Sequence, residues 1–241
     1  MSRTNKENDR IPNPSEKYLK WSSDNKSFYY WDKNANDGDG AEVLIPENTP
    51  FIILDMLNCC VGYDEKLDTP LRSNEVRNIK AHAFRLYAGR KEVAHGVWED
   101  IKGHSGVKFA KSVYAMAKID GEFRLVNIKM SGAACGAWFD FVKDHGGERK
   151  LYGDVVIAQV GSEEGKKGKV TYYRPVFEII SRKLSDEARE MADRMDAEEL
   201  QPYIKSYFES QGKESVEEAE VTETEEVEEA EDDEEAIELP F

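Results

Sequence analysis

The chain is poor in cysteine and histidine, the residues that most often hold structural metals. It has three cysteines and four histidines among 241 residues, and no CxxC spacing occurs. Adjacent Cys59 and Cys60 with one further cysteine do not suggest a disulfide framework. The histidines lack a spacing typical of metal ligands, so we expect no metal site; they are His82, His95, His104 and His145.

Long apolar segments are also absent. The first twenty residues contain no apolar core typical of a secretory leader, and no segment approaches the roughly 20 apolar residues of a membrane span. These absences predict a protein of a reducing cytoplasm with no membrane partner.

Motifs of catalysis and cofactor binding are lacking too. There is no P-loop and no GxGxxG, and the glycine-rich segment 161–168 lacks the Walker spacing. Cys135 stands among small residues, but no histidine is paired with it at a recognisable spacing, so we interpret it as a small core residue. We therefore expect no enzyme, no catalytic residue and no cofactor.

Negative charge is concentrated at the C-terminal end. Residues 214–241 hold 15 acidic residues and no basic one. Such a run cannot bury enough apolar surface to offset the entropy of ordering it, so we expect a disordered tail over 211–241. Its tip differs, because an apolar pair, a rigid proline and a terminal aromatic ring make a compact ligand for a partner protein: Ile237, Leu239, Pro240 and Phe241. A simple solubility tail is the plainer interpretation.

This tip resembles a known family. Tails of bacterial single-stranded-DNA-binding proteins end in acidic residues, an aliphatic residue, proline and phenylalanine, and phage proteins of this kind end in an acidic segment and an aromatic residue. The resemblance covers about ten residues, and Glu238-Leu239 stands where the bacterial tip usually has Asp-Ile. It implies a bacterial or phage-encoded protein of DNA replication, recombination or repair. Its tail would compete with DNA for the binding groove and recruit a polymerase, primase, helicase or recombinase.

Without this tail the chain is nearly neutral. Removing its 15 carboxylates from the 49 in the chain leaves 34 acidic against 33 basic residues. Within the remainder, Arg72 to Lys129 holds 12 basic and 6 acidic residues. This local excess of positive charge is compatible with binding an anionic partner.

The clearest local signal is Asp120-Gly121, the preferred type I′ hairpin turn. It predicts that Val113 pairs with Ile128 and Lys118 with Phe123. One face of the hairpin is then a core face: Val113, Ala115, Ala117, Val126 and Ile128. The other mixes rings and cations, and is either a stacking platform or a second half-buried face covered by the N-terminal region: Ser112, Tyr114, Met116, Lys118, Phe123, Leu125, Asn127 and Lys129.

The order of the expected elements predicts a mainly β fold. A strand over 75–88 precedes the hairpin strands 110–119 and 122–130, a helix over 133–144, and strands over 153–160 and 168–180. This order matches the oligonucleotide/oligosaccharide-binding (OB) fold, a five-stranded barrel. We expect an arm over 1–17, an OB domain over 18–210 with added N-terminal strands and a C-terminal helical region, and then the tail.

Binding of single strands needs lysines and arginines along the backbone and rings that stack on bases. The candidates lie on the outer hairpin face and in the loops after the first and fourth barrel strands: Arg85, Tyr87, Arg90, Lys91, Trp98, Lys108, Phe109, Lys111, Tyr114, Lys118, Phe123, Lys129, Lys166, Lys167, Tyr172 and Arg174. The leading hypothesis is a protein that binds single-stranded DNA without strong sequence preference. The alternative is an acidic-tailed interaction or assembly factor that does not bind nucleic acid. Whether the chain forms a homo-oligomer is left open.

Overall fold

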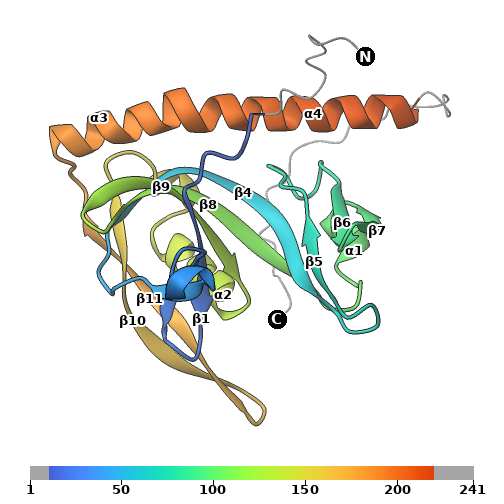
Figure 1. The fold of residues 1–241 in the computed structure, drawn as a ribbon, viewed down its shortest axis with the longest axis horizontal. Helices are drawn as coiled ribbons and strands as arrows, with labels where there is room; N and C mark the ends of the chain where they lie inside the picture. The colour runs from blue at the N-terminus through green and yellow to red at the C-terminus, as the bar shows by residue number, and fades with distance from the viewer. Residues whose placement is uncertain (1–10, 220–241) are drawn as a thin grey trace.

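The structure is a computed structural model that describes residues 11–219, with the backbone alone for 212–219. The expectation of a mainly β fold is confirmed, because eleven strands join in one sheet (Figure 1). In chain order they are β1 (Lys17–Ser22), β2 (Ser27–Asp32), β3 (Ala41–Leu44), β4 (Phe51–Asp64), β5 (Thr69–Ser73), β6 (Phe84–Ala88), β7 (Lys91–Gly96), β8 (Val107–Ile119), β9 (Glu122–Ser131), β10 (Val156–Lys167) and β11 (Val170–Ser181).

The helices fall into two groups. The short α1 (Trp98–Ile101) and the longer α2 (Ala133–Asp144) follow β7 and β9 respectively. The C-terminal region is one continuous helical segment made of α3 (Asp186–Arg194), the π-helix η3 (Met195–Leu200) and α4 (Gln201–Ala219), and it crosses the top of the sheet in Figure 1. Two 3-10 turns complete the set, η1 (Asn36–Gly38) and η2 (Glu148–Lys150).

The sheet does not close on itself. Its strand order is β3-β2-β1-β9-β8-β4-β5-β6-β7, and β10 joins both β4 and β11. Most neighbours are antiparallel, but β1 runs parallel to β9. The 14-residue β4 lies at the centre of this order and pairs with β5, β8 and β10.

The hairpin of β8 and β9 has the predicted turn and register. Asp120 and Gly121 have φ angles of 54° and 83°, as a type I′ turn requires. Val113 pairs with Ile128 and Lys118 pairs with Phe123. The predicted core face is also confirmed, because its residues join the main hydrophobic cluster beneath α2: Val113, Ala115, Ala117, Val126 and Ile128.

The other face of this hairpin is covered by the C-terminal helical segment. Tyr114, Met116 and Leu125 are buried in a second cluster with residues of this helical segment, Leu200 and Ile204 among them. Of the two interpretations of this face, burial holds for these three residues. The covering element was wrongly expected to be the N-terminal region, although one residue of the N-terminal arm does contribute, because Asn13 donates a hydrogen bond to the Tyr114 hydroxyl.

Other boundaries differ from those expected. The strand predicted over 75–88 begins only at Phe84, and its partners are β5 and β7. The strand that pairs with β8 of the hairpin is β4 instead. The expected loop over 161–168 is instead the end of β10, paired with β11 as far as Lys167. At the C-terminal end, α4 continues to Ala219, past the expected start of the tail at 211. The tip residues Ile237, Leu239, Pro240 and Phe241 lie outside the described residues.

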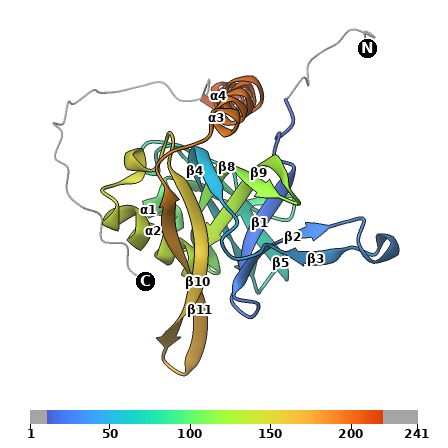
Figure 2. The same ribbon diagram turned by 90° about the vertical axis from the view of Figure 1, so that its left-hand side faces the viewer.

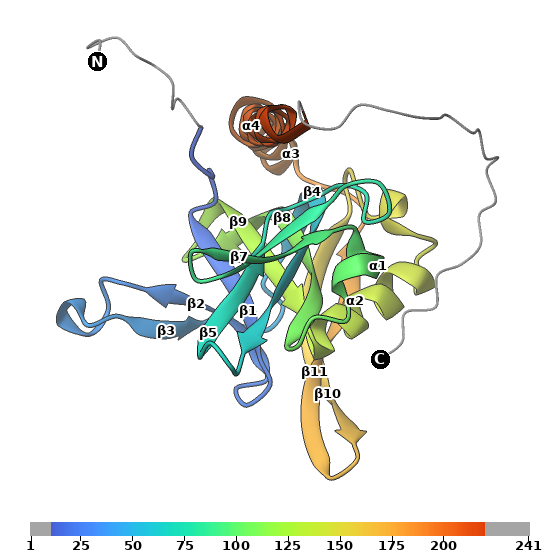
Figure 3. The ribbon, with the colours of Figure 1, turned by 90° about the vertical axis from the view of Figure 1, so that its right-hand side faces the viewer.

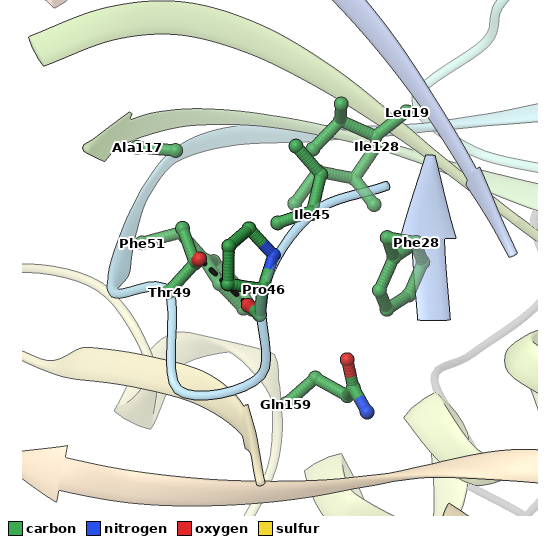
Figure 4. A pocket seen from close by; sticks show the side chains of 9 residues that line it. All are labelled: Leu19, Phe28, Ile45, Pro46, Thr49, Phe51, Ala117, Ile128 and Gln159. Atoms are coloured by element: carbon green, nitrogen blue, oxygen red, sulfur yellow. Dashed lines mark hydrogen bonds between the residues drawn. The ribbon is translucent and has the colours of Figure 1, made fainter. Parts of the chain in front are cut away.

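The interior of the sheet leaves little empty space. Figure 4 shows a cavity between the N-terminal strands and β4, with Phe28, Ile45 and Phe51 in its wall. Its volume is about 20 Å³, which is room for about one water molecule. No described helix is long and apolar enough to cross a membrane.

Candidate nucleic-acid interface

Three of the predicted contact residues make their polar contacts within the protein: Tyr114 is buried under the C-terminal helices, Lys111 is buried next to Asn58, and Lys129 is partly exposed. Tyr114 has no exposed surface, and Lys111 is 6% exposed. The ammonium of Lys129 lies 3.1 Å from a carboxylate oxygen of Glu75, to which the Tyr114 hydroxyl also donates a hydrogen bond at 2.7 Å. Tyr114 and Lys111 were wrong as direct contacts to a base or phosphate, because they are buried and their polar groups are paired inside the protein. Lys129 is partly exposed, and its ammonium is paired with Glu75.

The charges in this buried network stabilise one another. Burial and the Glu75 carboxylate raise the pKa of the Tyr114 hydroxyl. Burial alone would lower the pKa of Lys129, but Cys59 and Glu75 beside it raise the pKa above its usual value. Lys111 forms an ion pair of 2.6 Å with Glu148. These charged groups are therefore paired within the protein, at positions where an unpaired ammonium would be costly.

A second group of predicted residues is accessible but dispersed. Phe123 packs against the cluster under the helices, and the ammonium of Lys118 lies 5.7 Å from its ring centroid. Arg174 forms ion pairs with Asp140 and Glu163. Lys166 pairs with Glu164 at 3.2 Å, and the ring of Tyr172 lies against Gly165 of the neighbouring strand.

The hairpin of β6 and β7 holds four more of the predicted contact residues. Arg85 and Tyr87 lie on one side of β6, opposite the buried Phe84 and Leu86. Burial raises the pKa of the Tyr87 hydroxyl, and a hydrogen bond with Glu92 raises it further. Arg90 and Lys91 lie at the turn. None of the four lines a described cavity.

The remaining four predicted residues meet in one groove. Trp98, Lys108, Phe109 and Lys167 come from α1, the first residues of β8 and the end of β10. The groove has a volume of about 410 Å³. Six further residues line it, none of which was predicted: Lys102, Val107, Gly132, Cys135, Gly136 and Phe139.

Three aromatic rings form a continuous wall of this groove. The ring centroids of Trp98 and Phe109 are 5.4 Å apart at an interplanar angle of 70°, an edge-to-face contact. Phe109 and Phe139 are stacked, with centroids 6.0 Å apart and planes 29° from parallel. All three rings are partly exposed. Trp98 and Phe109 also pack against the small cluster under β6, which holds them in place.

The first turn of α2 contributes small residues to the groove. Gly132 and Gly136 have no side chains to fill it, so backbone is accessible there. Gly132 precedes the helix with φ 56° and provides no side-chain cap. The free backbone N–H groups of a helix start carry partial positive charge, which adds to the positive potential of the nearby lysines.

Three lysines surround the rings. Lys102 forms an ion pair with Glu99 one turn earlier. Lys108 and Lys167 are exposed and form no ion pair with another described residue. Two ammonium groups are thus available to an anionic ligand without first breaking a salt bridge.

Cys135 lies at the base of the groove as a neutral thiol. Burial raises its pKa to about 12, against a partial opposing effect of a backbone hydrogen bond from Lys111. A thiol with this pKa is a weak nucleophile at neutral pH. This agrees with its interpretation from sequence as a small core residue.

One further cavity has the wrong charge for a nucleic acid. It has a volume of about 280 Å³ and lies between α3 and the junction of β4 with β10. Its wall contains Asp154, Asp193 and Asp196 with the single cation Arg189, which pairs with Asp154 at 2.6 Å. Among the residues whose side chains are described, no cluster of histidine, cysteine, aspartate and glutamate could hold a metal.

The helix periodicity of 133–144 could have revealed Phe139. Trp138, Phe141 and Val142 face the core, and Phe139 falls on a different side of the helix with Cys135 and Gly136. A ring that lies outside the apolar face of a helix indicates a contact with something other than the core. Lys102 had no such signal.

Comparison with protein-family models found no family that matches this chain. Searches among curated proteins and among solved structures also found no match. The function must therefore be inferred from the groove and from the sequence.

Proposed function

We propose that the protein binds single-stranded DNA in the groove of Trp98, Phe109 and Phe139, without strong sequence preference. The observation that carries this proposal is the combination of three partly exposed rings with three lysines around one open groove. Rings accept any base because every base has a π-face, and lysines follow the phosphates.

The energetics favour single strands over duplex. Stacking contributes about 1–3 kcal/mol for each base, and it requires bases that are free of their partner strand. A duplex keeps its bases stacked internally, so it would gain only the phosphate contacts of Lys102, Lys108 and Lys167.

The strand pairing supports the OB fold as the framework. In that fold a three-stranded meander is followed by a helix and by two more strands, of which the first pairs with strand one. Here β4, β8 and β9 form the meander, α2 follows it, and β10 returns to β4 before pairing with β11. The place beside β9 is taken by β1, so β11 does not complete a barrel.

The acidic tail supplies the second part of the proposal. Its tip, with Leu239, Pro240 and Phe241, recruits replication or repair proteins such as a polymerase, primase, helicase or recombinase. Its carboxylates compete with DNA phosphates for the lysines of the groove, because tethering holds them at a high effective concentration. The resemblance of the tip supports this role.

The test compares two half-buried phenylalanines. Phe139→Ala removes a ring from the groove, and Phe123→Ala removes a ring that packs against the helices elsewhere. Fluorescence anisotropy with labelled oligo-dT should show a loss for Phe139→Ala of about 1–3 kcal/mol and little change for Phe123→Ala. Urea unfolding of both variants separates lost affinity from lost stability.

Two results would contradict the proposal. If the wild-type protein does not bind oligo-dT at low salt, the alternative of an acidic-tailed assembly factor without nucleic-acid binding is favoured. If Phe123→Ala reduces affinity and Phe139→Ala does not, the binding surface lies at the tip of the β8–β9 hairpin instead.

A further inference from the structure

The outer part of the β10–β11 hairpin projects away from the body of the protein (Figure 2). We call this part, residues 163–174, the distal hairpin. Glu163 pairs with Arg174 at its base, and Lys167 belongs to the last residue pair before its turn. Lys167 also lines the groove, together with Phe139 of α2. The distal hairpin therefore supplies one of the three lysines of the groove, and its position determines where that ammonium lies.

Two sets of contacts hold the distal hairpin, both at its base. On one side, the indole N–H of Trp21 donates a hydrogen bond of 2.9 Å to the Tyr173 carbonyl, and the Tyr173 N–H donates one of 2.8 Å to the Ser23 hydroxyl. On the other side, Arg174 contacts α2, which lies beside the base of the hairpin in Figure 3. Nearer the turn, the hydrogen bonds and ion pairs among the described residues stay within the distal hairpin. The contacts at the base therefore determine the position of Lys167.

Arg174 joins two other elements at this base. Its Nη1 lies 2.6 Å from Oδ2 of Asp140 on α2, and its Nε lies 2.5 Å from Oε1 of Glu163 on β10. The guanidinium is planar and fixes the direction of each N–H, so two carboxylates bound at once restrict the angle between the hairpin and the helix. Asp140 directly follows Phe139 in α2. The position of Lys167 relative to the ring of Phe139 therefore depends on Arg174.

Charge and position argue against Arg174 as a direct contact to phosphate. The guanidinium and its two carboxylates together carry a net charge of −1, which repels a phosphate. Arg174 is not among the residues that line the groove, although Lys167 is. A DNA strand would have to break two ion pairs in order to use this guanidinium.

We propose that Arg174 is a positioning residue for DNA binding, which holds Lys167 at the groove by joining Asp140 to Glu163. The inference rests on the proposed function, since the position of Lys167 matters only if the groove takes a nucleic-acid strand. A lysine held in place loses less conformational freedom on binding than a mobile one. Without Arg174 the hairpin gains freedom, because the register shift before Gly161 already interrupts its pairing there.

Removal of the Asp140 carboxylate distinguishes positioning from direct contact. Asp140→Ala takes away a negative charge near the groove, so electrostatics alone would tighten the binding of labelled oligo-dT. It also takes away one of the two partners of Arg174, so we expect the affinity to fall at least about two-fold, the lower end of the coupling within one salt-bridge network. Asp154→Ala is the matched control. Asp154 also pairs with an arginine at 2.6 Å, but it borders the acidic cavity, so its loss should not weaken binding.

Arg174→Lys tests the shape of the guanidinium. Lysine keeps the positive charge, but it cannot hold two carboxylates in a fixed geometry. We therefore expect Arg174→Lys to lose as much oligo-dT affinity as Arg174→Gln, whereas a direct contact to phosphate would be kept in the lysine variant. Lys167→Gln should lower the salt slope by about 0.7 in the wild-type background and by less in Arg174→Gln, because the ammonium is no longer held at the groove.

Urea unfolding of each variant separates lost affinity from lost stability. Tighter binding by Asp140→Ala overturns the proposal, and so does an equal loss in Asp154→Ala or an Arg174→Lys variant with wild-type affinity. An equal effect of Lys167→Gln in both backgrounds overturns it too, and leaves the groove as the binding site if Phe139→Ala still reduces affinity. A wild-type protein that does not bind oligo-dT, in contrast, overturns the proposed function and this role of Arg174 with it.

Discussion

The lysines of the groove allow the binding proposal to be tested through its salt dependence. Each phosphate contact on a single strand contributes about 0.7 to the slope of log affinity against log salt. Replacing Lys102, Lys108 and Lys167 with glutamine should therefore lower the slope by about two. From about 50 to about 200 mM salt, a slope difference of two corresponds to about a 16-fold smaller loss of affinity for the triple variant. Anisotropy titrations with labelled oligo-dT at several salt concentrations measure this directly.

The structure also ranks the three lysines. Lys102 already pairs with Glu99, whereas Lys108 and Lys167 have no carboxylate partner among the described residues. We expect Lys102→Gln to change the slope least, since its contact with phosphate replaces a salt bridge. Lys118→Gln is the control, because Lys118 is exposed at the far hairpin tip. An unchanged slope in the triple variant, or an equal change in the control, would refute this placement of the DNA.

Three further predictions concern other parts of the chain. Leu200→Ala should lower the free energy of unfolding in urea by about 2–5 kcal/mol, because Leu200 is the fully buried residue with which the C-terminal helical segment packs on the sheet. A loss below about 1 kcal/mol would contradict that packing. Burial raises the pKa of Cys60 and of Cys135 to about 12, so a thiol reagent at neutral pH should react with them only after unfolding. The stability that these neutral thiols contribute below their unfolded pKa of 9.0 should be lost as the pH rises towards 12. Deleting residues 214–241 should tighten DNA binding at low salt. The gain should be smaller near physiological salt, because charges are screened over a Debye length of about 8 Å there. Equal affinity and an equal salt slope with and without these residues would exclude competition by the tail.

Local signals predicted local structure well. Asp120-Gly121 determined the β8–β9 register, because its turn type needs positive φ at both residues. This requirement depends only on the four residues of the turn, so it can be recognised in the sequence. The helix over 133–144 has the predicted bounds, since glycines flank it and its apolar residues repeat at helical spacing.

Pairing between distant strands could not be predicted in the same way. The long apolar run of β4 has the composition of a central strand, but composition does not say which strand lies beside it. The assignment of the first barrel strand to 75–88 failed for this reason. The segment before Phe84 is held by side-chain contacts, among them two hydrogen bonds from Arg77 to Asp55.

Aromatic and basic residues that alternate along a strand are ambiguous for a physical reason. A stacking platform for DNA has this pattern, and so does a half-polar interface between a sheet and an amphipathic helix, as Tyr114 and Lys129 show. What distinguishes the two is whether the cation has an acidic partner. Lys129 pairs with Glu75, which lies more than fifty residues away in the chain, so the ion pair cannot be predicted from the sequence. Lys108 and Lys167 have no such partner among the described residues, and a cation without one is free to bind the anions of a ligand.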